Sequence, residues 1–189
     1  MLLSGRGEEV AQQCEQIVQN SGIEWTIVRA SWFNQNFSES FLYEWVISGQ
    51  VMLPPGDIGE PFIDAEDIAD VATVALLEDS YHGELYELTG PRLLTLAQAV
   101  KEIAEAIGRP IEYVQIPHDA FLDGLAAQGL PERMIWLMDY LFKTVLDGRN
   151  SKLADGVQRA FGRPARDFSA YVQETAHSGV WQREAMPHG

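Results

Sequence analysis

The chain has 189 residues, a length that suits one domain or a sheet domain with a helical addition, and its 46% apolar content can form a core. With 28 Asp and Glu against 13 Lys and Arg, the net charge of −15 repels nucleic-acid phosphates and anionic lipid, so neither is an expected partner. No apolar run is long enough to cross a membrane. Cys14 is the only cysteine, which excludes an internal disulfide and indicates a reducing, cytoplasmic setting.

The first 30 residues predict a strand, a helix and a second strand. Residues 2–5 (LLSG) are typical of a strand end that runs into a glycine-rich turn. Residues 8–20 have helical periodicity, and their apolar stripe consists of Val10, Cys14, Ile17 and Val18. Residues 25–28 (WTIV) are a β-branched and aromatic run. A strand, helix and strand in this order predict two parallel strands.

The rest of the chain alternates at first and is then helical. Short strands are expected at 51–53, 84–88 and 111–116, with helices at 38–48, 65–78 and 96–108. From residue 118 onward only helical patterns follow, at 119–128, 131–146, 151–161 and 167–178. We therefore expect a parallel α/β domain over residues 1–116, a helical region over 117–181 and a loose tail at 182–189.

A polar and aromatic run follows the strand predicted at residues 25–28. Ligands of open α/β sheets bind just beyond the carboxyl ends of strands, which is where this run would lie. Its members are Arg29, Ser31, Trp32, Phe33, Asn34, Gln35 and Asn36. The alternative is that Trp32, Phe33 and Phe37 are core residues and that the amides cap the next helix. The sequence leaves both interpretations open.

Most motifs that carry chemistry are absent. The sequence contains no G-x-G-x-x-G, no phosphate loop of the Walker type, no H-E-x-x-H and no C-x-x-C. The four histidines are scattered without ligand spacing, and no serine lies in a G-x-S-x-G. Asp64, Glu66 and Asp67 are explained by capping at the start of the helix predicted at 65–78, so no metal site is expected.

Several segments, in this order and spacing, resemble the NmrA-like branch of the atypical short-chain dehydrogenases/reductases. They are LLSGRGEE (2–9), IEWTIVRASWFNQNF (23–37), PFIDAEDIADVATVAL (61–76), GELYELTGPRLLTLAQAV (83–100) and GRPIEYVQIP (108–117). The helical remainder to about Trp181 is similar to the family's substrate-side region. The resemblance implies a Rossmann-type sheet that binds NADP or NAD, followed by a smaller substrate region.

The sequence also departs from this family. The strand with the glycine-rich phosphate loop is missing, so we expect a partial sheet, a truncated protein, and weak or absent binding of NADP or NAD. Ser4 matches the family's serine and is the one catalytic candidate. The tyrosine and lysine of the family's proton-donating pair are absent from residues 8–20, and Ala11 stands where many relatives carry lysine. Tyr43 or Tyr86 is left as a substitute donor.

Two functions remain open. The first is an NmrA-like NAD(P)-dependent oxidoreductase. The sequence does not decide whether this chain is catalytically active. The second is a non-catalytic regulatory protein that binds a ligand or senses dinucleotides. In both, a small molecule would contact a pocket formed by Ser4, Arg29, Ser31, Trp32, Phe33 and Asn36. An uncovered first strand further predicts a homodimer or higher oligomer, with residues 1–30 in the interface.

Overall fold

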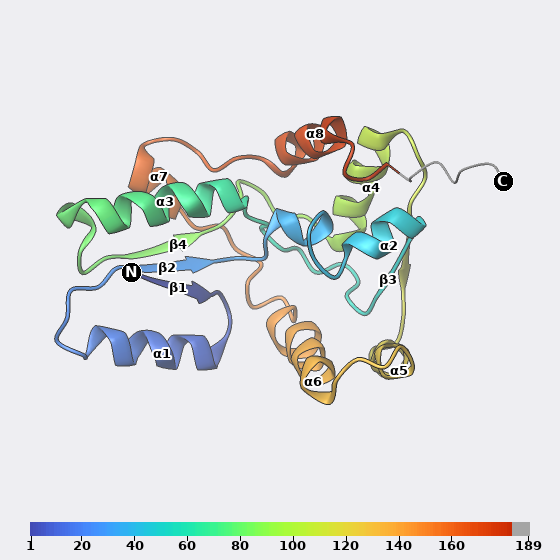
Figure 1. Cartoon of the computed structure of the whole chain (residues 1–189), viewed down its shortest axis with the longest axis horizontal. Coiled ribbons are helices and arrows are strands. Elements are labelled where there is room, and N and C mark those ends of the chain that lie inside the picture. The colour runs from blue at the N-terminus through green and yellow to red at the C-terminus, as the bar shows by residue number, and fades with distance from the viewer. Residues whose placement is uncertain (183–189) are drawn as a thin grey trace.

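Three short parallel strands form the first sheet of the computed structural model, which describes residues 1–182 (Figure 1). These strands are β1 (Leu2–Gly5), β2 (Ile27–Ala30) and β4 (Leu85–Leu88), in the order β1-β2-β4. The parallel α/β class predicted from the sequence is confirmed. The predicted tail lies outside the described residues, except for Gln182.

A second parallel sheet pairs β3 (Gln50–Leu53) with β5 (Glu112–Gln115). Helices connect and cover the strands, and in the described part of the chain the α-helices are α1 (Glu9–Gln19), α2 (Tyr43–Ser48), α3 (Ala65–Leu77), α4 (Leu96–Ile107), α5 (His118–Ala127), α6 (Glu132–Tyr140), α7 (Gly156–Phe161) and α8 (Phe168–Ser178). Short 3-10 turns, η1 (Asn34–Phe37) and η2 (Asp79–Tyr81), and a π-helical turn, η3 (Leu141–Val145), complete the order. None of the helices in residues 1–182 has the length and apolar character that a membrane crossing requires.

The two faces of the first sheet differ in polarity. Figure 1 shows α1 and α3 on opposite sides of β2. Val28 and Ala30 of β2 share a buried apolar cluster with Ile68 and Val71 of α3. Because side chains alternate along a strand, Arg29 points away from this cluster, toward α1. One face of the sheet is therefore apolar, and the other carries charge.

The second strand begins and ends two residues later than the sequence predicted. Its partners pair with it only from Ile27, which lies opposite Leu2 of β1 and Leu85 of β4. The last paired residue is Ala30, opposite Gly5 and Leu88. The β-branched run marked the strand but not its limits, since those depend on where the neighbouring strands begin and end.

The larger core joins residues from both sides of position 116. Phe37 stacks edge-on against Phe62 and Phe168, with ring centroids 5.5 and 5.6 Å apart. The indole of Trp181, only 1% exposed, donates a hydrogen bond to the Phe37 carbonyl at 2.9 Å. The C-terminal helices therefore pack into the same core as β3 and α4. The predicted boundary between an α/β domain (1–116) and a helical region (117–181) concerns independent folding, and it stays a prediction.

Local capping follows the sequence closely. Asp64 accepts a hydrogen bond from the Glu66 amide at the start of α3, and Thr95 and Gln98 form a reciprocal capping box at the start of α4. Asp167 caps α8 and also binds Arg92, which forms a two-pronged ion pair with Glu102 of α4. The Arg92 guanidinium holds the pKa of Asp167 below its usual range. This cluster fastens α8 to α4.

Two glycine-to-alanine substitutions should have opposite effects. An added Cβ at Gly156, the first residue of α7, would lie 2.3 Å from the Glu87 carbonyl oxygen and 2.7 Å from a Leu88 methyl group. We expect Gly156→Ala to lower the free energy of unfolding by about 1–3 kcal/mol, because α7 must move off β4. Gly124 inside α5 has open space around it, so Gly124→Ala should stabilise by about 0.5–1 kcal/mol. Urea unfolding measures both, and equal effects would contradict this packing.

Candidate functional site

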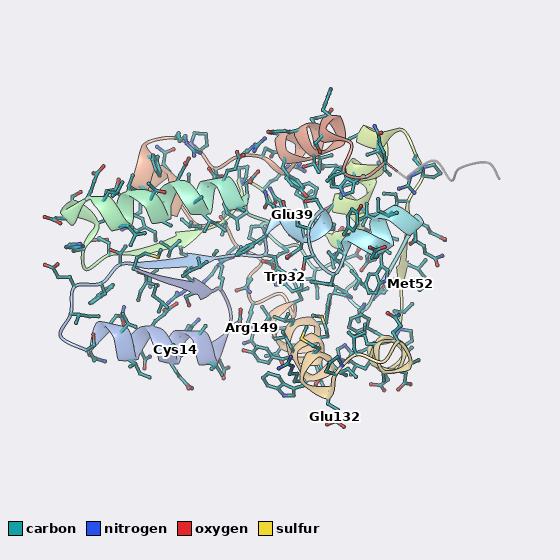
Figure 2. All side chains as sticks on the ribbon, viewed as in Figure 1. Cys14, Trp32, Glu39, Met52, Glu132 and Arg149 are labelled. Carbon is teal, nitrogen blue, oxygen red and sulfur yellow. The ribbon has the colours of Figure 1, made fainter. Side chains whose placement is uncertain are left out.

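A cavity of about 350 Å³ lies at the carboxyl ends of β1 and β2. Figure 2 shows Trp32, from the segment after β2, in the middle of the molecule between the first sheet and the helical part. The cavity is lined by Leu3, Ser4, Gly5, Arg6, Glu8, Ala30, Ser31, Trp32, Phe33, Asn36, Phe41 and Leu141. This volume lies within the range of small-molecule pockets.

The wall of this cavity includes the aromatic side chains of Trp32, Phe33 and Phe41, and it draws on distant parts of the chain. Trp32 packs edge-on against Phe41 and Phe142, with ring centroids 6.3 and 5.5 Å apart. Phe142 and Leu141 belong to η3, a π-helical turn of a kind often found at functional sites. The cavity is thus lined by the ends of the strands on one side and by the helical region on the other.

Five of the six residues predicted for the pocket come together here, namely Ser4, Ser31, Trp32, Phe33 and Asn36. Arg29 is the exception, because it lies within β2 rather than beyond its end. Its guanidinium binds both carboxylate oxygens of Glu15 on α1, with Nε 2.9 Å from Oε1, and approaches Glu87 at 3.2 Å. Arg29 therefore holds α1 on the sheet instead of lining the cavity.

These charges form a buried network on the polar face of the sheet. Ser4, Arg29 and Glu87 lie side by side in the register of the three strands. Burial is the largest influence on the pKa of Glu15, which is 2% exposed, and raises it, but hydrogen bonds from Arg29 and Ser4 together with the charge of Arg29 outweigh burial and lower this pKa. Arg6 binds Glu87 at 2.6 Å, which lowers the pKa of that carboxyl despite its burial. Both ion pairs contribute stability near neutral pH that is lost as acid protonates the carboxylates.

Ser4, the catalytic candidate, sits between this network and the cavity. Its hydroxyl oxygen is buried and has no hydrogen-bond partner within bonding distance. It is nevertheless close enough to the Glu15 carboxylate to help lower the pKa of that group. The Ser4 hydroxyl therefore lies between the Glu15 carboxylate and the space that a ligand would occupy.

The two interpretations of the segment after β2 apply to different residues. Gln35 caps a helix, but this helix is α3 and not the next one along the chain: its side-chain amide donates to Asp64 at 2.8 Å and accepts from the Ala65 amide at 2.9 Å. Phe37 is a core residue with no exposed surface. Asn36, in contrast, faces the cavity together with Trp32 and Phe33.

Glu60 is a feature that the sequence did not indicate. It is 2% exposed, and the Ser31 hydroxyl donates to its Oε1 at 2.6 Å. Burial raises the pKa of Glu60 to about 7, and hydrogen bonds from Ser31 and the Trp32 amide, with the charge of Arg6, oppose this only in part. Because folding raises this pKa from its ordinary 4.5, the contribution of Glu60 to stability falls as pH rises between these values. No sequence motif surrounds Glu60, so its place next to the cavity is recognised only from its contact with Ser31 in the structure.

The residues for a dinucleotide are present in part. The cavity wall offers aromatic faces and the Asn36 amide, but a diphosphate needs a glycine-rich turn with free amides at a helix start. In residues 1–182, the turn at Gly5 and Gly7 before α1 has that position, but side chains fill it. Added Cβ atoms there would meet the Glu8 carboxylate and the Asn150 amide. Glu8 and Glu9 also place negative charge at this helix start, so the turn does not fit a diphosphate.

The substitute proton donors do not reach the cavity. The Tyr43 hydroxyl donates to the Val180 carbonyl at 3.3 Å, and Tyr86 packs between Tyr81 and the Arg159 guanidinium. Within the described part of the chain, no group of three or more histidine, cysteine, aspartate or glutamate side chains has the arrangement of a metal site. Asp64 is engaged in capping α3, as expected.

Parallel strands with a ligand-sized cavity at their carboxyl ends are the geometry of α/β proteins that bind ligands at the sheet edge. Comparison with known proteins identifies the group: the NmrA-like family matches residues 11–169, and the chain belongs to this family. An NAD(P)H azoreductase from Xenophilus azovorans is 32% identical over 169 residues, which are 88% of this chain and 57% of that protein. The chain thus spans little more than half the length of such relatives.

Solved structures share the fold. A NADPH-dependent quinone oxidoreductase from Escherichia coli superposes with a TM-score of 0.76 at 21% identity, covering 90% of this chain and 60% of the other. NmrA, a negative transcriptional regulator in complex with NADP, superposes with a TM-score of 0.58 at 17% identity, covering 90% of this chain and 58% of the other. At these identities the likeness concerns the fold, which is that of Rossmann-like NAD(P)-binding proteins.

Removing Arg29 should leave Glu15 buried without its partner. We expect Arg29→Met to lower the free energy of unfolding by on the order of 3 kcal/mol at pH 7, because a carboxylate loses its compensating charge in a buried site. The double variant Glu15→Met with Arg29→Met should recover most of this loss. Urea unfolding of the three proteins measures the difference, and a double variant no more stable than Arg29→Met would contradict the network.

Proposed function

We propose that this protein is an NAD(P)H-dependent oxidoreductase whose cavity holds the nicotinamide end of the cofactor and a small-molecule substrate. The observation that carries the proposal is the convergence of Ser4, Ser31, Trp32, Phe33 and Asn36 on one cavity at the strand ends. The kinship with the azoreductase, described as using NAD(P)H, supports it.

The proposed roles follow from the chemistry of each side chain. Trp32 and Phe33 offer apolar faces against which flat rings can stack, and these faces exclude water. Asn36 can donate to and accept from an amide and so orient it. The hydroxyls of Ser4 and Ser31 lie where they could donate to a substrate oxygen. Bound NAD(P)H would supply the hydride for reduction.

The second candidate is a regulatory protein that binds a ligand without turning it over. It is favoured by the lack of a tyrosine and lysine pair on α1 and by the positions of Tyr43 and Tyr86 away from the cavity. The shared fold with NmrA, a regulator crystallised with NADP, is in keeping with this role. The filled turn at Gly5 and Gly7 supports weak dinucleotide binding in either case.

One series of measurements separates these functions. Calorimetric titration should give an NADPH dissociation constant weaker than micromolar, because several charge-assisted hydrogen bonds to the diphosphate are absent. NADPH oxidation with a quinone or an azo dye as acceptor should then proceed at high NADPH. Trp32→Ala should lower kcat/KM at least about tenfold, since it removes the aromatic wall of the cavity.

The matched control is Trp136→Ala, because this indole is 63% exposed and lies outside the cavity lining. It should leave kcat/KM unchanged within about twofold. Specific ligand binding without NADPH oxidation would favour the regulatory function. Equal losses in both tryptophan variants would contradict the assignment of the cavity.

We further propose that the protein is cytoplasmic and self-associates through residues 1–30. The exposed, unpaired Cys14 is in keeping with a reducing compartment. β1 lies at the edge of its sheet, and the stripe on α1 faces solvent, with Val10 63% and Ile17 70% exposed. A second copy would cover both an open strand edge and this apolar stripe.

Light scattering should report a mass of at least twice the 21.1 kDa of the monomer at micromolar concentration. Ile17→Glu should shift the protein toward the monomer, because it places a charge within the buried stripe of the interface. The matched control Leu77→Glu alters a side chain that is similarly exposed (77%) but lies at the end of α3, on the opposite side of the sheet from α1. A concentration-independent monomer would contradict the proposal.

A further inference from the structure

A buried carboxylic acid lies directly behind the cavity. Glu60 has almost no exposed surface, and its backbone pairs with Leu94 in an isolated antiparallel bridge that holds the residue in place. Its carboxylate faces Ser31, which lines the cavity and donates its hydroxyl hydrogen to Glu60 at 2.6 Å. Ser31 thus lies between the buried Glu60 carboxylate, which a ligand could not contact, and the cavity, which a ligand could occupy.

The charges around Glu60 do not neutralise it. Arg6, on the turn after β1, is the nearest positive group, but its Nε binds Glu87 and its Nη1 binds the Asn150 carbonyl. Its Nη2 is buried without a hydrogen-bond partner, so no atom of the Arg6 guanidinium pairs with the Glu60 carboxylate, although Arg6 also lines the cavity. Glu60 therefore depends on the Ser31 hydroxyl and the Trp32 amide, and its neutral form is accessible near pH 7.

The protonation state of Glu60 decides what Ser31 can do. An ionised carboxylate only accepts hydrogen bonds, so it holds the single hydrogen of the Ser31 hydroxyl. A protonated carboxyl can instead donate its own hydrogen to the Ser31 oxygen. The hydroxyl hydrogen of Ser31 is then free to turn into the cavity.

We propose that Ser31 is a switchable hydrogen-bond donor to a carbonyl oxygen of an aromatic ligand in the cavity, and that protonation of Glu60 turns this donor on. The ligand class follows from the lining: aromatic faces from Trp32 and Phe33 for a flat ring, and the Ser31 hydroxyl, in addition to that of Ser4, for a neutral oxygen acceptor. The inference rests on the proposed ligand-binding role of the cavity but requires neither a cofactor nor turnover.

The test uses two ligands of the same shape, 1-indanone and indane, of which only the ketone has an oxygen acceptor. Neither ionises between pH 5.5 and 8.5, so any pH dependence comes from the protein. Affinity for 1-indanone, measured by ligand-observed NMR titration, should fall about three- to tenfold from pH 5.5 to 8.5, the effect of one hydrogen bond. Affinity for indane should not change.

Two substitutions assign the effect. The amide of Glu60→Gln can donate to Ser31 at every pH, so this variant should bind 1-indanone at pH 8.5 as tightly as the unmodified protein does at pH 5.5. Ser31→Ala should bind the ketone at both pH values with the weaker affinity. A pH dependence that persists in Glu60→Gln, or a Ser31→Ala variant that binds like the unmodified protein, would overturn the proposal.

A direct readout guards against variants that fold poorly. The side-chain carboxyl carbon of Glu60, followed by 13C NMR in the unmodified protein and assigned by its loss in Glu60→Gln, should titrate near pH 7 and shift when 1-indanone binds. Titration below pH 5, or no binding of 1-indanone at any pH, overturns the inference. Neither result depends on NADPH, so failure of the proposed reductase activity is recognised separately.

Discussion

The pairing of β2 on both edges is the constraint on which the rest of the structure depends. Strands β1 and β4 hold it in register up to Ala30, and this fixes the point where the chain leaves the sheet. Every residue after that point is placed by the geometry of the sheet edge. As a result, Ser31 donates a hydrogen bond to Glu60. Trp32 and Asn36 line the cavity, and Gln35 caps α3. A shift of one residue would exchange the apolar and charged faces of the strand.

The charged face shows why this register is strongly specified. Arg29 is surrounded by Glu15 and Glu87, and Arg6 completes the compensation of Glu87. Buried charges of this kind add little net stability compared with a well-packed apolar core, but they are costly when unpaired. A slipped strand would leave Glu15 without its partner under α1. The network thus favours one alignment of β1, β2, β4 and α1.

The cavity joins two parts of the fold with different origins. The strand ends supply hydroxyls and the segment after β2 supplies aromatic and amide groups, whereas Leu141 comes from a π-helical turn more than one hundred residues later. The two proposed functions, reduction of a substrate and binding of a regulatory ligand, would both place a ring in this cavity and differ only in whether the ligand reacts. Glu60 adds a titratable group behind the wall, so the hydrogen-bonding character of the cavity is coupled to pH through a residue that no ligand contacts.

The sequence by itself determined the local features of this protein, namely the parallel α/β class and the caps at Asp64 and Thr95. It also proposed the five residues that the structure brings to the cavity, while leaving a core role open for Trp32 and Phe33. These follow from periodicity, from capping chemistry and from the position of a polar run after a strand, all of which act over a few residues. Only the tertiary structure decided that Arg29 belongs to the ion network, that Gln35 caps a helix, and that Glu60 lies behind Ser31. These contacts join residues 14 to 58 positions apart, and strand pairing sets them.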